Sequence, residues 1–350
     1  MAYTTIDDPE AHFQVVTYTG DGQDNRDVTL PGATDLPVDF VWVKNRDASN
    51  HGSAFYDKLR GATKRMEPYN QNAESTKTSG VSAFNSDGFD VGNIGANNSN
   101  TVKYVAFCWK ANGSGSSDTN GTINSTATSA NTTAGFSIVS YEGNNTQGAT
   151  VGHGLGVAPA VVIVKNREST YNWAVWHQDL LGAAYVTNLN STAAQGSIPG
   201  VFNGTLPTST VFSLGGGGQS DRFLSNEPNI DFIVYIFSEV KNYSKFGKYK
   251  GNGSTDGVYV YTGFRPALVI TKQISGAGSW FLFDNKRNGF NETEPYVMAN
   301  VTNTEATDLG WDLLSNGFKI RNNYVNTNAA NQDYVYLAFA ESPFKNNRAR

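Results

Sequence analysis

Four histidines are the side chains of this sequence best suited to metal binding or proton transfer: His12, His51, His153 and His177. A metal site needs two or three converging ligands. His153 lies in a glycine-rich turn before an apolar run, and we favour a turn residue with a hydrogen-bonded imidazole over a ligand or base. His177 has Asp57 and Asp284 at the matching places of the repeats described below. A turn-capping acceptor fits all three residues, so we expect no metal and no cofactor.

Carboxylates could support glycan hydrolysis if two of them stood roughly 5 to 10 Å apart across a groove. Glu239 and Glu341 hold equivalent places in two repeats, and we do not expect equivalent residues to meet as acid and base. Other acidic residues in loops show no recognisable pairing, namely Glu227, Asp231, Glu292 and Glu294. The aspartates of loop 20–27 could ligate calcium, but loop 143–148 of the next repeat lacks carboxylates. An ordinary Asp/Gly turn explains loop 20–27, and we expect no catalytic residue.

Nucleotide and nucleic-acid binding are not supported. The run 151–156 (VGHGLG) is followed by a proline and an apolar strand, whereas a phosphate-binding loop opens a helix. The net charge is −5, and no Lys/Arg block longer than a pair stands out, so the electrostatic signature of nucleic-acid binding is missing. Lys44 to Arg46 and Lys165 to Arg167 end apolar runs. We expect solvated strand ends there, able to dock an acidic neighbour.

The tryptophans offer the last kind of binding chemistry, because their rings could stack on sugars. Trp173, Trp176 and Trp280 are the candidates for surface or glycan contacts, together with Trp42. Aromatic residues on half-buried strands more often belong to the core. Cys108 lies between Phe107 and Trp109 without a basic neighbour, which indicates an inert core thiol.

The elements that would position these residues are short strands. The chain of 350 residues has 36 Gly, 17 Tyr and 20 Phe, and only 16% charged residues. Apolar runs of five to eight residues, bounded by Gly, Asn, Pro and Asp, recur with turn signals about every 8 to 12 residues, which is typical of β-sandwiches or barrels. The longest apolar runs are about six residues, too short to cross a bilayer, and the first residues do not resemble a signal peptide.

One pattern of landmarks occurs three times along the chain. Each copy opens with Tyr-x-Gly at Tyr18, Tyr141 and Tyr249. An apolar strand after a proline, an aromatic strand with a polar turn, and a Phe after small residues follow in the same order. Each copy closes on an apolar strand, in which we match Phe107, Phe237 and Phe339. These lie 89, 96 and 90 residues after the opening tyrosines.

The repeats predict an all-β protein of three tandem antiparallel β-sandwich, jelly-roll-like modules of about 100 residues. Their predicted bounds are 12–110, 135–245 and 246–345, after an amino-terminal arm at 1–11 and before a basic tail at 345–350. Segment 111–134 is almost wholly Ser, Thr, Asn, Gly and Ala, which indicates an extended or flexible linker. We therefore expect modules two and three to pair tightly, with module one on a longer tether.

Four stretches carry a family resemblance: TTAGFSIVSYEG, VGHGLGVAPAVVIVKNR, YSKFGKYKGNGSTDGVYVYTGFRPALVI and LSNGFKI…YVYLAFAESPFK. The sequence resembles an uncharacterised family of virion-associated proteins of the tail-fibre or structural type, found mainly in marine tailed bacteriophages. The resemblance covers essentially residues 1–345. It implies a structural or host-adhesion protein built from β-sandwiches, and it transfers no catalytic motif.

Three functions follow as hypotheses. The first is a non-enzymatic tail-fibre or adhesin-type virion component that contacts the host surface. The second is a decoration or stabilising protein of the capsid, and the third is a fibre-borne glycan depolymerase. We expect assembly in the host cytoplasm, homo-oligomers, and other virion proteins as partners. A host surface glycan or receptor is a further candidate partner, whereas we expect neither nucleic-acid binding nor membrane insertion.

Overall fold

The computed structural model describes residues 6–342 and confirms the prediction of an all-β protein. Residues 1–5 of the predicted arm and the basic tail at 345–350 lie outside the described residues. Helical structure in the described part is confined to short turns: η1 (Pro9–Ala11), α1 (Pro199–Phe202), η2 (Arg222–Leu224) and α2 (Val325–Asn328).

The first third of the chain forms a main sheet and a smaller one, which together we call the first unit (residues 13–109). The main sheet has the order β1-β9-β3-β4, from β1 (Phe13–Thr19), β9 (Lys103–Trp109), β3 (Phe40–Asn45) and β4 (Ser53–Asp57). The small sheet is β2 (Arg26–Val28), β8 (Gly88–Val91) and β7 (Val81–Asn85). A hairpin of β5 (Lys64–Arg65) and β6 (Ser75–Thr76) follows β4.

The second unit (residues 127–237) repeats this plan with extra strands. Its main sheet consists of β10 (Ala127–Asn131), β11 (Phe136–Glu142), β18 (Asp231–Phe237), β13 (Val161–Asn166), β14 (Ala174–His177), β15 (Tyr185–Asn188) and β16 (Gly196–Ser197), in that order. Its small sheet is β12 (Thr150–Gly152) and β17 (Val211–Ser213).

The third unit (residues 244–342) follows the same plan. Its main sheet consists of β19 (Ser244–Lys250), β26 (Asp333–Ser342), β21 (Arg265–Gln273), β22 (Trp280–Asp284) and β23 (Tyr296–Met298), in that order. Its small sheet is β20 (Tyr259–Tyr261), β25 (Gly317–Ile320) and β24 (Trp311–Leu314).

The three main sheets share one strand register, which identifies equivalent residues. In each sheet the strand that carries the opening tyrosine (β1, β11 or β19) pairs with the last strand of the unit, so that Phe13 lies opposite Trp109, Phe136 opposite Phe237, and Ser244 opposite Phe339. Trp109 is therefore the equivalent of Phe237 and Phe339. The sequence match of Phe107 to those two phenylalanines is wrong by two residues, because the first unit carries a tryptophan where the others carry phenylalanine.

The central strands of each main sheet are buried on both faces. Along β3, Val41 and Val43 pack toward the small sheet of the first unit, whereas Phe40 and Trp42 join a cluster that all three units share. Alternate side chains of a strand point to opposite faces, so this strand contributes to two cores. The same alternation explains why strands such as β3 and β13 are apolar along their whole length.

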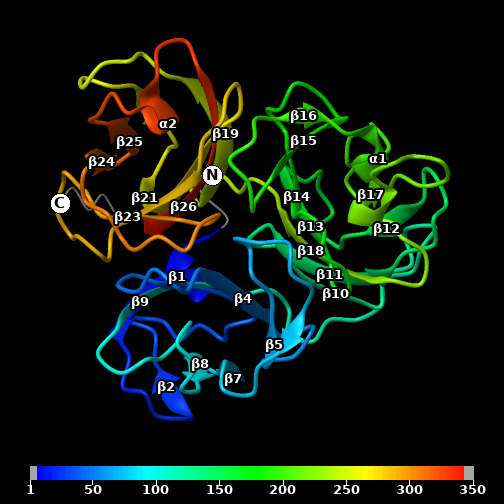
Figure 1. The fold of residues 1–350 in the computed structure, drawn as a ribbon, viewed down its shortest axis with the longest axis horizontal. Helices are drawn as coiled ribbons and strands as arrows, with labels where there is room; N and C mark the ends of the chain where they lie inside the picture. Colours follow the sequence, from blue (N-terminus) through cyan, green and yellow to red (C-terminus); the bar gives the residue numbers. More distant parts are fainter. Residues whose placement is uncertain (1–5, 343–350) are drawn as a thin grey trace.

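The shared cluster lies where the three units meet. The equivalent residues Trp109, Phe237 and Phe339 contact one another, with ring centroids 5.5 to 6.2 Å apart. Figure 1 shows the units as three lobes around this centre, the first in blue and cyan, the second in green and the third in yellow to red. The sheets thus form one body in a near-threefold arrangement, while the module bounds read from the repeats stay a prediction.

Segment 111–134 differs from the expected linker. It contains β10, which pairs with β11 and covers the edge of that strand. At its start, Ala111 N–H and Gly113 N–H donate to the buried Asp39 carboxylate. Small polar residues allow such close packing as well as flexibility, so composition alone did not distinguish the two. The first unit packs directly against both others rather than on a tether.

Candidate functional site

Three buried lysines mark the seams between the units. Lys44, Lys165 and Lys272 are equivalent by strand register. Each lies opposite the residue four positions before the central aromatic residue of its unit, which is Trp109, Phe237 or Phe339. All three are 0% exposed. The expectation of solvated strand ends is therefore wrong for Lys44 and Lys165, since the strands end against a neighbouring unit rather than in water.

Each lysine donates to a backbone carbonyl of another unit. Lys44 Nζ reaches Val301 O at 2.9 Å, Lys165 Nζ reaches Gln71 O at 3.1 Å, and Lys272 Nζ reaches Thr192 O at 3.1 Å. The first unit thus bonds to the third, the second to the first, and the third to the second. The three bonds run in one direction around a closed ring.

Two seams add the same ion network. In one, Arg60 bridges Asp57 at 2.5 Å and Glu74 at 3.1 Å, and Glu74 also binds Arg167 of the second unit. In the other seam, equivalent positions repeat the set: Arg287 bridges Asp284 and Glu305, and Glu305 binds Arg46 of the first unit. Arg46 and Arg167 therefore bind carboxylates of a neighbouring unit, the alternative to solvation that their positions allowed.

The third seam keeps the backbone geometry and lacks these charges. Gln195 N–H donates to Ile274 O, just as Glu74 N–H donates to Arg167 O and Glu305 N–H to Arg46 O. His177 stands where the other two seams have Asp57 and Asp284. Leu180 stands where they have Arg60 and Arg287. Leu180 and Ile274 belong to a small apolar cluster, so this seam between the second and third units is closed by packing and by hydrogen bonds, that of Lys272 included, without an ion network.

Burial lowers the pKa of the seam lysines, to about 7 for Lys165 and about 8 for Lys44 and Lys272. A lysine with a folded pKa below its unfolded value of about 10.4 takes up a proton on unfolding, so its contribution to stability rises with pH. We expect the stability difference between the wild-type protein and Lys165→Met to grow by about 2 kcal/mol from pH 7 to pH 9.

Denaturant titrations at the two pH values would measure this difference. Met cannot donate to the carbonyls of Gln71, Ser169 and Tyr171, which Lys165 serves. The variant is therefore less stable at both pH values, and a difference that stays constant with pH would contradict a neutral Lys165 at pH 9.

His177 makes the third seam sensitive to acid. Its Nδ1 accepts a hydrogen bond from Asp179 N–H, and its Nε2 faces Tyr336 O of the third unit. These two partners suit a neutral imidazole. Burial lowers the pKa of His177 to about 4. His177 in the unfolded chain, with a pKa of about 6.5, binds a proton at a higher pH than His177 in the folded protein. The free energy of unfolding should therefore fall by about 3 kcal/mol as the pH drops from about 6.5 to 4. His177→Asn keeps a capping oxygen and should lose this term, measured as the pH dependence of the unfolding free energy.

The rim of each unit is held by a buried asparagine that the sequence analysis missed. Asn98, Asn226 and Asn328 each accept a hydrogen bond from the backbone N–H that follows the Tyr-x-Gly glycine, at Asp21, Asn144 and Asn252. The opening tyrosines donate to the carbonyl just before each asparagine, namely Asn97, Ser225 and Thr327. This pairing explains why Tyr-x-Gly recurs.

The glycine of the motif is required by close approach of the backbone. A Cβ on Gly20, Gly143 or Gly251 would stand 2.0 to 2.2 Å from the carbonyl oxygen of the residue after the asparagine. Only glycine leaves room for that contact. Tyrosine, glycine and asparagine together therefore fix where the outer loop of each unit leaves the sheet.

The three tryptophans proposed as glycan contacts are buried, so that hypothesis is wrong. Trp173, Trp176 and Trp280 are 0%, 4% and 2% exposed. Trp173 Nε1 donates to Glu67 O of the first unit, and Trp280 Nε1 donates to Asn188 O of the second. These strands are covered on both faces, which leaves no side on which a ring could meet a sugar. Trp42, at 4% exposure, is likewise in the shared core.

The histidine interpretations agree with the structure. His153 is buried in its turn, with Nε2 facing Thr208 O and Nδ1 accepting from Leu155 N–H. Asp57, like His177, caps the turn after its strand, through Arg60 N–H. Asp284 caps its own turn through Lys286 N–H. Burial also raises the pKa of Cys108 well above its usual value, in keeping with an inert thiol.

Two of the acidic residues considered for catalysis or calcium binding, Glu239 and Asp24, bind separate polar neighbours. Glu239 binds Lys245 and accepts from Phe246 N–H, while the side chain of Glu341 lies outside the described residues. In loop 20–27, the Asp24 carboxylate accepts hydrogen bonds from the backbone N–H and the side-chain amide of Asn93. Among residues 6–340, His, Cys, Asp and Glu form no group of three or more that could hold a metal ion.

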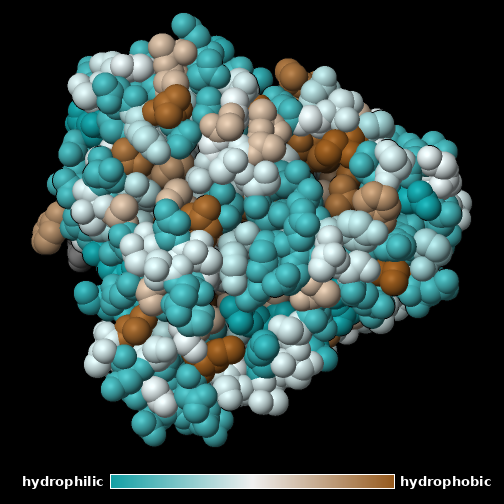
Figure 2. All heavy atoms as spheres, in the orientation of Figure 1, coloured by the Kyte–Doolittle hydropathy of each residue, from teal (hydrophilic) through white to brown (hydrophobic). Residues whose placement is uncertain are grey.

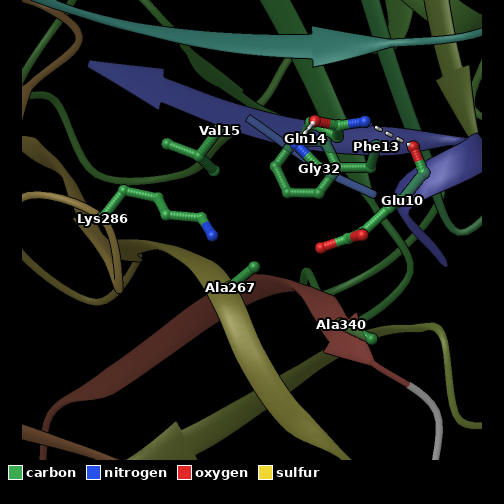
Figure 3. Close-up of a pocket in the computed structure, with 8 residues that line it drawn as sticks. All are labelled: Glu10, Phe13, Gln14, Val15, Gly32, Ala267, Lys286 and Ala340. Carbon is green, nitrogen blue, oxygen red and sulfur yellow. Dashed lines mark hydrogen bonds between the residues drawn. The ribbon is translucent and has the colours of Figure 1, made fainter. Parts of the chain in front are cut away.

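A pocket of about 20 Å³, room for one water molecule, lies between the first and third units. Figure 3 shows the Glu10 carboxylate and the Lys286 ammonium group extending toward each other over Ala267. Gln14 closes one side and donates to Glu10 O at 3.0 Å. A site of this size and polarity suits a bridging water.

The outer face of the third unit's small sheet carries exposed aromatic residues. Tyr259 and Tyr261 alternate with the buried Val260 on β20 and are 43% and 64% exposed. Tyr259 lies opposite Lys319 on β25, which binds Asp256 at 2.6 Å. The face in Figure 2 is mostly hydrophilic, with apolar residues in separate patches.

Comparison with known proteins gives one assignment. A family described as Domain of unknown function (DUF7483) matches residues 8–343. No curated protein and no solved structure matches the chain. None of the helices in the described part is long and apolar enough to cross a membrane. Because the match spans nearly the whole sequence, the chain belongs to the family Domain of unknown function (DUF7483).

Proposed function

We propose that the protein is a non-enzymatic structural component of a bacteriophage particle, of the tail-fibre or adhesin type, that contacts the host surface. The observation that carries this proposal is the closed ring of three sheet units around one aromatic core. Together with the sequence resemblance to virion-associated proteins, this architecture supports a mechanical role.

The ring suits mechanical display because both its centre and its rim are fixed. Buried lysines and ion networks join the units around the ring. At the rim, the buried asparagines hold the loop that follows the strand with the opening tyrosine in each unit. Rigid loops bind with less loss of conformational entropy than mobile ones, which favours a surface made for contact.

A capsid decoration protein is the second candidate, and the near-threefold arrangement favours it. Virions are built with symmetry, and three equivalent faces around one axis suit a threefold position on a shell. The exposed tyrosines on a single unit favour the adhesin, because a decoration protein at such a position would use all three units alike.

Antibody labelling of purified particles of the encoding phage tests the proposal. Label on the tail is the expected result, and label distributed over the shell would favour the decoration protein. Absence of the chain from purified particles by mass spectrometry would overturn both versions.

A further inference from the structure

We propose that Tyr259 and Tyr261, with the charged side chains beside them, form a binding platform for a neutral glycan. The platform consists of Tyr259, Tyr261, Lys319, Asp256 and Arg321. This inference rests on the proposed adhesin function and names the class of surface molecule that it would bind.

Comparison of the units shows that the fold does not require these tyrosines. The pairs Val28 with Phe89 and Val260 with Phe318 are equivalent, and Val151 with Phe212 holds the same place in the second unit. The residues matching Tyr259 and Tyr261 are Asp27 and Thr29 in the first unit, and Thr150 and Gly152 in the second. Polar or small residues therefore serve at these positions, and the exposed rings need another reason.

The geometry of β20 suits a small flat ligand. Residues two apart on a strand present their side chains on one face, about 7 Å apart, so the two rings can meet successive parts of one saccharide. β20 is an edge strand of three residues, and the residues on either side of it, Val258 and Thr262, hydrogen-bond to the backbone of Ile320 and Asn316. Hydrogen-bonded positions alternate along an antiparallel pair, so the backbone groups of Tyr259 and Tyr261 point outward. The edge is too short to template a long added strand, unlike β19, whose seven residues carry three lysines.

The charges beside the rings are balanced. Lys319 binds Asp256, and Arg321 binds Asp312 at 2.6 Å, with Asp256 3.8 Å away. Carboxylates accept and ammonium and guanidinium groups donate, so the face offers both partners that a hydroxyl group needs. A neutral polyhydroxyl ligand fits such a face, whereas an acidic polymer would meet Asp256, whose side chain is 79% exposed.

Affinity electrophoresis of the intact chain tests the platform. Native gels would contain hydroxyethylcellulose, laminarin, mannan or starch as neutral probes, and alginate as an acidic probe. We expect retardation by at least one neutral polymer. Tyr261→Ala should weaken binding about tenfold through loss of ring contact, whereas Tyr261→Phe, which keeps the ring, should bind like wild type.

Two further variants keep the test specific. Phe290→Ala removes the most exposed large apolar side chain among the residues whose burial is described, at 81%, and should leave the retardation unchanged. Tyr259→Ala also loses a hydrogen bond to Asn316 Oδ1, so its fold must be checked by circular dichroism, which is why Tyr261 is the main probe.

Four results would overturn the platform: no retardation by any neutral polymer, retardation by alginate alone, retardation that survives Tyr261→Ala, or a wild-type dimer that Tyr261→Ala dissociates. The outcome is separate from that of the proposed function. Tail-located protein without glycan binding would leave the adhesin proposal standing, and glycan binding by a chain absent from particles would remove only the virion role.

Discussion

Replacing Trp109 by alanine is expected to lower the free energy of unfolding by about 3 to 5 kcal/mol. The indole contacts Phe13 within the first unit, at 4.8 Å between ring centroids, and Phe237 and Phe339 of the other units. Its removal opens a cavity where all three sheets meet, and none of them can close it without moving the others. Guanidinium titration followed by circular dichroism measures the loss.

The chain supplies the matched control for this variant. The other units hold phenylalanine at the equivalent position, so Trp109→Phe should cost much less than Trp109→Ala, about 1 kcal/mol. If the alanine variant lost no more than the phenylalanine variant, the central contact would not be what joins the units.

Replacing Arg60 by leucine is expected to cost a similar amount, about 3 to 5 kcal/mol, for an electrostatic reason. The side chains of Arg60 and Asp57 are both 0% exposed and lie 2.5 Å apart. Without the guanidinium, Asp57 remains a buried carboxylate with the Tyr235 hydroxyl as its side-chain hydrogen-bond donor. The same unfolding titration, performed at pH 7, measures the effect.

The third seam shows how this loss can be recovered. Its residues His177, Leu180, Gln195 and Ile274 stand where the first seam has Asp57, Arg60, Glu74 and Arg167. The combined variant D57H/R60L/E74Q/R167I should recover most of the stability that Arg60→Leu alone loses, because replacing a whole buried ion network by neutral residues is often close to neutral. A combined variant as unstable as the single one would contradict the equivalence of the seams.

The sequence predicted the all-β fold because turn residues and short apolar runs are local signals. It also located the repeated Tyr-x-Gly motif, yet not its partner. Asn98, Asn226 and Asn328 each lie eleven residues before the central aromatic residue, a spacing that the mismatch of Phe107 concealed. The strand register, which cannot be read from the sequence, was needed to align Trp109 with Phe237 and Phe339.

The seams could not be predicted because they join residues far apart in the chain. Lys44 bonds to a carbonyl 257 positions away, and a polar residue at a strand end usually meets water. The same holds for Trp173 and Trp280, whose indole N–H groups bond to carbonyls of neighbouring units. Tyr259 and Tyr261 alternate with valines in the sequence, but only comparison with the other units shows that the fold does not need them.

The seam that lacks the ion network joins the two units that the chain connects most directly, through residues 238–243 between β18 and β19. Such a short connection gives the second and third units a high effective concentration for each other, so modest contacts suffice. The first and third units adjoin without any direct covalent connection, and there the full network of Arg46, Glu305 and Arg287 is present. A backbone cut within 238–243 would therefore remove the short covalent connection across the seam that lacks the ion network. We expect the ring of three units to open at that seam first.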